Sequence, residues 1–129
     1  MSELRIGLRG RATLRVEAIH TAEALGSGDV PVFGTPSLVA LLETAAVNAV
    51  AGRLGPGETT VGTWLDVAHL AATPVGADVS AEAELVGIEG RKLTFTVVAY
   101  DNRTKIGECR HHRMIVSRDR FLAKALSPQ

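Results

Sequence analysis

The chain has little of the chemistry that marks secreted proteins and proteins that bind polyanions. Only one of its 129 residues is a cysteine, Cys109, so no disulfide can form within the chain, and the first five residues contain no apolar stretch of signal-peptide length. Lys and Arg together number 14, as do Asp and Glu, so no excess of positive charge attracts nucleic acid or an anionic membrane. We therefore expect a cytoplasmic protein with no nucleic-acid and no membrane partner.

Long hydrophobic runs, internal repeats and low-complexity tracts are also absent. The longest apolar runs, residues 38–42 and 44–47, are separated by Glu43 and fall far short of the roughly 20 residues that a membrane span requires. A chain of 129 residues with 46% hydrophobic residues suits one compact domain with a continuous core. We expect residues 1–129 to form a single domain with one functional site.

One long helix is predicted for residues 36–54. Thr35 is a typical N-cap residue and Pro36 is favoured at the first helical position, whereas the Gly-Pro-Gly sequence of residues 55–57 is a strong stop signal. The predicted helix is apolar on almost every side, and Glu43 is one of its few strongly polar residues. Such a helix belongs in a protein core.

The rest of the chain predicts β-structure. An opening strand is expected at residues 9–18, followed by a flexible loop at residues 26–29. Four further stretches rich in Val, Thr and Ile are expected to be strands: residues 59–71, 78–88, 92–100 and 105–116. Because only short turns, such as residues 89–91 and 101–104, join the last three, these strands should form an antiparallel meander.

These elements indicate an α+β protein with the hotdog layout, in which one long central helix packs against an antiparallel β-sheet. One helix covers only part of one face of such a sheet, and a second copy of the chain would complete the burial. We therefore expect a homodimer, and a dimer of dimers is an alternative.

Glu43 is the most informative residue. The residues one helical turn away from it are apolar and offer no cation, so burial should raise the pKa of its carboxyl group. An unpaired buried carboxylate costs several kcal/mol, and perturbed carboxylates cluster at active sites. The alternative is a Glu on a narrow solvent-exposed stripe, or one satisfied by a backbone amide across the dimer.

His69 lies on the predicted strand 59–71. In that strand Val61, Thr63, Leu65, Val67 and His69 share one face, and Gly62, Trp64, Asp66 and Ala68 share the other. The first face is the more aliphatic and is expected to meet the helix. His69 would then lie near Glu43 as an acid, a base or an orienting donor. Taken alone, a histidine here is more often a hydrogen-bonded core residue.

Thr35 has a structural explanation, because a threonine before proline caps a helix whether or not the protein is an enzyme. The N-terminus that it caps is also a cluster of free N–H groups, which can stabilise the oxyanion formed when a carbonyl group is attacked. Thr35 can serve in both ways.

The other polar residues predict less. His111 and His112 are adjacent on a strand and point to opposite faces, so they cannot bind one metal ion, and no zinc-type spacing occurs. We expect no metal and no cofactor. Ser37 and Cys109 lack the neighbouring base that an activated nucleophile needs.

Several motifs follow one another along the chain: Thr35, Leu-Leu-Glu at residues 41–43, Gly62 and Thr63, His69, residues 71–76, residues 89–93, Ile106 and Gly107, His111 and Arg113. Together they resemble the fluoroacetyl-CoA thioesterase family of hotdog proteins. The resemblance runs without gaps through most of the chain from Phe33 onward. It implies that Thr35, Glu43 and His69 form the catalytic set.

The resemblance also implies that Gly62 and Arg113 belong to the substrate site. We expect Phe33 and Gly34, which precede the helix, to bind substrate as well. The namesake of the family has a Phe-rich segment upstream that helps to cover a small fluorinated acyl group, whereas residues 26–32 here contain no Phe. The resemblance therefore implies hydrolysis of an acyl-CoA thioester without fixing the acyl group.

The leading hypothesis is hydrolysis of a short or medium acyl-CoA, in which Glu43 attacks the carbonyl or activates water. His69 would assist proton transfer, and Arg113 or a nearby Lys would meet the CoA phosphates. One alternative is a module that binds an acyl thioester or another small ligand without turning it over. Another is an enoyl-CoA hydratase, although the chain lacks the longer insert expected for one.

Helix geometry constrains this site. Thr35 and Glu43 are eight residues apart, so their backbones lie about 12 Å apart along one helix, too far for both to touch one small reacting group. If both belong to one site, the helix N-terminus of one protomer must face Glu43 of the other.

Overall fold

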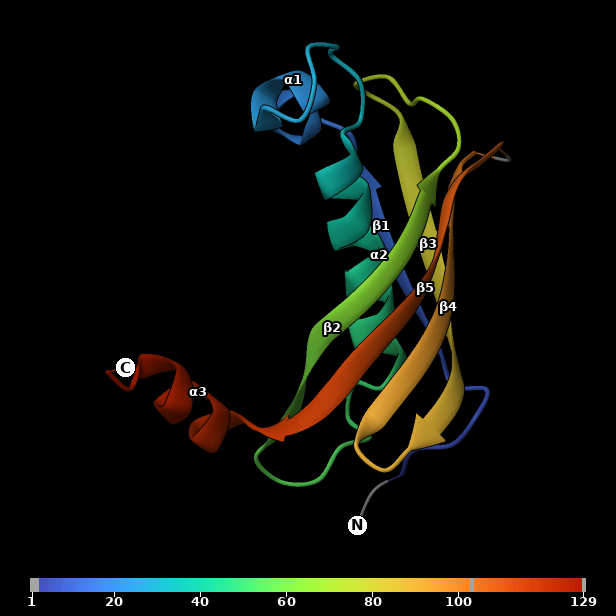
Figure 1. Cartoon of the computed structure of the whole chain (residues 1–129). Coiled ribbons are helices and arrows are strands. Elements are labelled where there is room, and N and C mark those ends of the chain that lie inside the picture. Colours follow the sequence, from blue (N-terminus) through green and yellow to red (C-terminus); the bar gives the residue numbers. More distant parts are fainter. Residues whose placement is uncertain (1–2, 103, 129) are drawn as a thin grey trace.

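The computed structural model describes residues 3–102 and 104–128, which form one curved sheet and four helical segments (Figure 1). Their order is β1 (Arg9–Arg15), η1 (Ala18–His20), α1 (Ala22–Leu25), α2 (Thr35–Ala49), β2 (Glu58–His69), β3 (Asp78–Glu89), β4 (Lys92–Asp101), β5 (Thr104–Ser117) and α3 (Arg118–Leu126). The first segment, η1, is a single 3-10 turn.

The sheet has the strand order β1-β3-β4-β5-β2, and every pairing in it is antiparallel. The predicted meander of the last three strands is confirmed, because β4 pairs with both β3 and β5. The predicted turn at residues 101–104 includes Arg103, which lies outside the described residues. Strand β2 pairs with β5 alone in the described sheet, so the twelve residues of β2 form one edge.

Helix α2 packs on one face of this sheet and forms the core with it, as its apolar sequence predicts. Its buried residues are Leu38, Leu41, Leu42, Ala45, Ala46 and Ala49. The N-terminal strand approaches very closely: a Cβ on Gly10 would overlap the backbone of Ala45 and Ala49. Only glycine permits this contact, which fixes how α2 lies across β1 and so positions Glu43.

Several predicted bounds are wrong. Helix α2 ends at Ala49 and not at residue 54, because Val50 already closes a tighter turn by donating to Val47 O and Gly52 adopts a left-handed φ of 74°. Residues 9–18 are not one strand: β1 ends at Arg15, and Ala18 begins η1. Helix α3 follows β5 directly and was not expected from the sequence.

One irregularity in β2 changes which residues face the helix. The register between β2 and β5 shifts between Gly62 and Trp64, which leaves Thr63 as a bulge. Gly62 therefore lies on the helix side, where an added Cβ would be 2.5 Å from Glu43 Oε2. The simple alternation that placed Gly62 opposite His69 is wrong for this reason, because an extra residue reverses the parity of the strand.

No helix in the described part of the chain is long and apolar enough to cross a membrane.

Candidate active site

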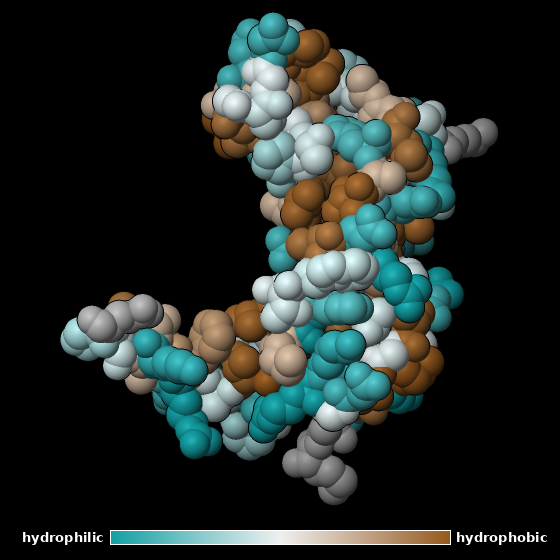
Figure 2. Space-filling model, viewed as in Figure 1, coloured by the Kyte–Doolittle hydropathy of each residue, from teal (hydrophilic) through white to brown (hydrophobic). Residues whose placement is uncertain are grey.

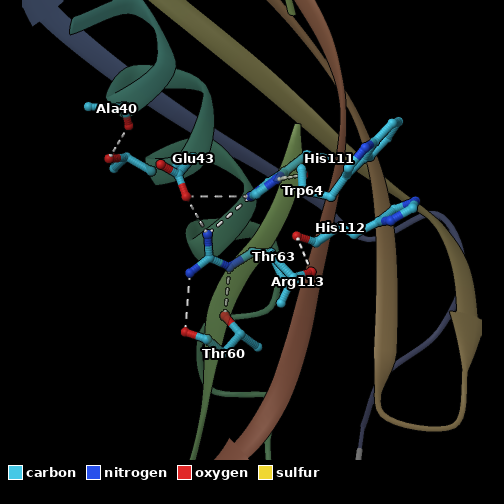
Figure 3. A network of polar contacts seen from close by, with 9 residues as sticks. Ala40, Glu43, Thr60, Thr63, Trp64, His111, His112 and Arg113 are labelled. Carbon is cyan, nitrogen blue, oxygen red and sulfur yellow. Dashed lines mark hydrogen bonds and ion pairs between the residues drawn. The ribbon is translucent and has the colours of Figure 1, made fainter. Parts of the chain in front are cut away.

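An ion pair joins the middle of α2 to strand β5. Arg113 Nη1 donates to Glu43 Oε2 at 3.1 Å. The same guanidinium donates from Nε to Thr60 Oγ1 at 2.9 Å and from Nη2 to the Thr60 carbonyl at 3.1 Å. Figure 3 shows that Arg113 thereby connects α2, β2 and β5. Burial lowers the pKa of Arg113, and Glu43 opposes this effect.

His111 lies beside this pair with no exposed surface. Its Nδ1 is 2.9 Å from the Trp64 carbonyl, which can only accept, so Nδ1 carries the proton. Its Nε2 is 3.1 Å from Arg113 Nη1, which can only donate, so Nε2 is the acceptor. These two contacts fix a neutral imidazole in one tautomer. Burial lowers the pKa of His111, and the charge of Arg113 lowers it further.

Glu43 is held by one oxygen only. All of its polar contacts to the described residues use Oε2, which also lies 3.8 Å from His111 Nε2. The side chain is 34% exposed. The expectation of a buried carboxylate without a cation is therefore wrong, because Arg113 comes from a strand 70 residues away in sequence. The carboxylate is therefore anchored through Oε2, and Oε1 has no polar contact with the described residues.

Thr35 and His69 form a second polar cluster at the N-terminal end of α2. Thr35 Oγ1 is 2.8 Å from His69 Nδ1, and His69 is the last residue of β2. The interpretation of Thr35 as the helix cap is wrong: Gly34 is the N-cap, and no side chain caps the helix. The Thr35 hydroxyl is thus turned to the histidine and not to the backbone.

One ring nitrogen of His69 lacks a well-formed hydrogen bond within the described part of the chain. This nitrogen, Nε2, is buried. Burial lowers the pKa of His69, and the Ala71 backbone opposes this effect. An unsatisfied buried polar atom of this kind often marks a functional position.

Within one chain the two clusters lie apart. Glu43 faces Gly62, whereas the Thr35 hydroxyl meets His69, seven residues further along β2. Seven strand residues span about 20 Å, and the backbones of Thr35 and Glu43 are about 12 Å apart along the helix. The expected approach of His69 to Glu43 within one chain is therefore wrong, and the histidine near Glu43 is His111.

Three substrate-binding predictions also change. Arg113 is 6% exposed and its guanidinium is engaged by Thr60, Glu43 and His111, so its place is in the interior and not at a CoA phosphate on the surface. Phe33 is 1% exposed and part of the core, and Gly34 is buried against Ala22. Phe33 and Gly34 support the start of α2, with no side-chain surface open to a ligand in this chain.

The alternation of residues in β5 indicates that His111 is buried. In an unbroken strand, positions 109, 111 and 113 share one face, and the structure buries all three. The buried thiol at the first of these, Cys109, has its pKa raised to about 12, chiefly by burial. It is therefore not an activated nucleophile.

The protein-family comparison matches residues 16–119 to a family described as fluoroacetyl-CoA-specific thioesterase. The fluoroacetyl-CoA thioesterase of Streptantibioticus cattleyicolor is 44% identical over 93 residues, which cover 72% of this chain and 67% of that protein. The chain belongs to the fluoroacetyl-CoA-specific thioesterase family.

Solved structures of a fluoroacetyl-CoA thioesterase agree with this membership. One has a TM-score of 0.88 and 36% sequence identity, and the match covers 97% of this chain and 98% of that chain. A Phe-to-Ala mutant in complex with fluoroacetate and CoA has a TM-score of 0.85 and 36% identity, over 92% and 99% of the two chains. A hot-dog-like protein from Thermanaerovibrio acidaminovorans, 20% identical, has a TM-score of 0.85 over 98% and 96%. The predicted hotdog fold is confirmed.

The neutral state of His111 predicts a specific pH dependence of stability in this thioesterase family member. Because the native pKa lies below the unfolded value of about 6.5, the unfolded chain binds a proton that native His111 does not. Stability should therefore fall as the pH drops below about 6.5, by up to about 1.4 kcal/mol per pH unit from this residue. The substitution His111→Gln retains a hydrogen-bond donor and an acceptor at this position but removes the titratable imidazole.

Urea unfolding at pH 7.5, 6.5 and 5.5 measures this difference. The wild-type free energy of unfolding should fall more steeply below pH 6.5 than that of His111→Gln, while the contribution of His69 is common to both proteins. Parallel pH profiles would show that His111 is not held neutral.

Proposed function

We propose that this chain hydrolyses an acyl-CoA thioester with Glu43 as the reacting carboxylate. As a member of its family the chain is a thioester hydrolase, and the proposal assigns the chemistry to its residues. The observation that carries it is the geometry of Glu43: Arg113 fixes Oε2 at 3.1 Å, while Oε1 remains available on a side chain that is 34% exposed. A positioned carboxylate is suited to attack a carbonyl or to deprotonate water.

In the general-base form of the reaction, Glu43 accepts a proton from water as the water oxygen bonds to the thioester carbonyl carbon. The tetrahedral oxyanion then collapses, the C–S bond breaks, and the proton goes to the departing CoA sulfur. In the nucleophilic form, Glu43 bonds to the acyl carbon, the C–S bond breaks and CoA leaves as the protonated thiol. Water then cleaves the resulting anhydride and restores the carboxylate. Both forms yield the free acid and CoA.

The Thr35–His69 pair provides the complementary functions. The N-terminus of α2 carries partial positive charge and has no side-chain cap, so it can stabilise an oxyanion placed beside Thr35. His69 is positioned by Thr35 Oγ1, and its buried Nε2 has no hydrogen bond of good geometry with the described residues. It is suited to transfer the proton to the leaving group.

These groups meet if two copies of the chain pair along β2. In such a dimer the two β2 strands pair antiparallel about a two-fold axis. If the axis passes near Leu65 and Asp66, midway between positions 62 and 69 of the strand, Gly62 of one copy lies opposite His69 of the other. Glu43 faces Gly62 and Thr35 bonds to His69, so each of two equivalent sites takes Glu43 from one chain and Thr35–His69 from the other. The homodimer is thus part of the proposal. A dimer of dimers and a cytoplasmic location stay predictions.

A panel of acyl-CoAs with detection of free thiol tests the reaction class. The panel should include acetyl-, fluoroacetyl-, butyryl-, hexanoyl- and crotonyl-CoA. We expect enzyme-dependent thiol release from at least one saturated member. Binding without thiol release would indicate an acyl-thioester binding module, and loss of the crotonyl double bond without thiol release would indicate a hydratase; either result contradicts hydrolysis.

Replacing Glu43→Gln should lower turnover at least about a hundredfold, because the amide keeps the shape but cannot act as a base. Steady-state rates on the best substrate of the panel, with circular dichroism to verify folding, measure the effect. The matched control is Glu82→Gln, which removes a carboxylate from an exposed position of β3 and should leave turnover within about twofold. Near-normal turnover in a folded Glu43→Gln protein would remove Glu43 from the mechanism.

The shared site predicts complementation between two inactive chains. A heterodimer of Thr35→Ala and Glu43→Ala chains, isolated with two affinity tags, should have one site with both defects and one intact site. Its turnover should be about half that of the wild-type dimer, provided that each parent homodimer is folded and nearly inactive. Sites built within single chains would each carry one defect, so an inactive heterodimer would exclude sharing across the dimer.

A further inference from the structure

Helix α3 leaves a hydrophobic side uncovered. None of its residues is buried, and Phe121, Leu122 and Leu126 are 47%, 54% and 76% exposed. At helical spacing these three residues share one side with Ala125, whereas Ala123 and Lys124 lie on the opposite side. Because the described residues bury none of its side chains, α3 gains little stability from its apolar side, and that side is available to another surface.

The position of α3 indicates where that surface is. Figure 1 shows the helix projecting from the end of β5 beyond the β2 edge, away from β3 and β4. Figure 2 shows a wide hollow between α3 and the region around α1, on the side of the molecule where the sheet ends. The helix therefore extends into the space that a second copy paired along β2 would occupy.

A second exposed apolar surface lies at the far end of the same side. We call residues 17–33, which include η1 and α1, the α1 lobe. Ile19, Leu25 and Val30 in this lobe are 69%, 44% and 51% exposed. The lobe is fixed to the loop after β2, because Phe33 N–H donates to Thr73 O at 2.9 Å. Exposed apolar side chains thus occur at both ends of the β2 edge.

The two ends also have opposite charge. No Lys or Arg occurs between residues 16 and 52, and the α1 lobe contains Glu17, Glu23 and Asp29. Helix α3 contains Arg118, Arg120 and Lys124 against one acidic residue, Asp119. At helical spacing Arg118 lies on the apolar side with Phe121 and Leu122, whereas Arg120 and Lys124 lie on the opposite side. The apolar side of α3 therefore carries one cation opposite in sign to the acidic lobe, and such complementary surfaces favour association.

The pairing register of the proposed dimer brings these ends together. Ser117, the residue before α3, pairs with Glu58 at the start of β2. A two-fold axis near Leu65 and Asp66, the position that assembles Glu43 with His69, places Glu58 of one copy level with Thr73 of the other. Helix α3 therefore begins beside the loop that carries the α1 lobe of the second copy.

We propose that α3 docks on the α1 lobe of a second copy of the chain, with Phe121, Leu122 and Leu126 against the exposed apolar residues of that lobe. A two-fold dimer contains this contact twice. The lobe is hydrogen-bonded to the start of α2, because Gly34 N–H donates to His20 O at 2.9 Å. Each docked α3 therefore stabilises the region that carries the Thr35–His69 cluster of its partner. The inference rests on the proposed dimer and not on the reaction.

Photo-crosslinking in the full-length protein tests this contact. Phe121 is replaced by p-benzoylphenylalanine, and chains carrying it are mixed with isotopically heavy wild-type chains before irradiation and mass spectrometry. We expect adducts between position 121 of a light chain and residues 17–33 of a heavy chain. The same crosslinker at Ala123, on the polar side of α3, should give at most about a tenth of that yield.

A pair of matched substitutions tests whether the α3 contact stabilises the dimer. Ala125→Glu and Ala123→Glu place the same side chain two residues apart in one helix, on its apolar and polar sides. Both positions are exposed in the single chain. We expect Ala125→Glu to weaken dimerisation, measured by sedimentation equilibrium, at least about tenfold more than Ala123→Glu.

The outcomes separate this proposal from the preceding one. Adducts within one chain, adducts at another surface of the second chain, or no protein adduct would overturn the docking of α3, as would equal effects of the two substitutions. If the dimer forms and the heterodimer of inactive chains recovers activity while these results are negative, the shared site stands and only the α3 contact fails. A monomer in sedimentation with thiol release intact would overturn the contact and leave hydrolysis in place.

Discussion

A buried guanidinium is tolerated only when its donors are matched, and this requirement at Arg113 organises the centre of the molecule. Thr60, His111 and Glu43 supply the acceptors, and they come from β2, β5 and α2 respectively. Removing any one acceptor would leave a buried charge partly unpaired. The interaction that fixes the proposed catalytic carboxylate therefore also fastens the helix to the edge of the sheet.

The backbone of β2 is shaped to permit this network. The bulge at Thr63 turns Gly62 toward the helix, and the absence of a side chain there leaves the space that Glu43 Oε2 occupies. The Trp64 carbonyl next to the bulge accepts from His111 and so determines which nitrogen of that ring faces Arg113. A bulge that sets the direction of several polar groups is a designed feature of a site and not a defect of the strand.

The sequence predicted the architecture more fully than the geometry of the site. Periodicity and turn residues sufficed for the long buried helix and the meander, because both patterns are local. Glu43 was identified correctly as unusual, but for the wrong reason: its cation is 70 residues away, and a search within one helical turn cannot find it. The bulge depends on strand pairing, and α3 has only nine residues, too few for a helical pattern in the sequence to be decisive.

The pairing of Glu43 with Arg113 has a consequence for the kind of molecule that the site can admit. An acyl-CoA carries several negative charges on its phosphates, and the reaction adds another on the carbonyl oxygen. An isolated carboxylate would repel both, whereas a carboxylate balanced by a guanidinium 3.1 Å away, beside a neutral imidazole, has almost no net field at longer range. In the proposed site a basic oxygen is thus available at short range, while the nearly neutral ion pair repels an approaching anionic substrate only weakly.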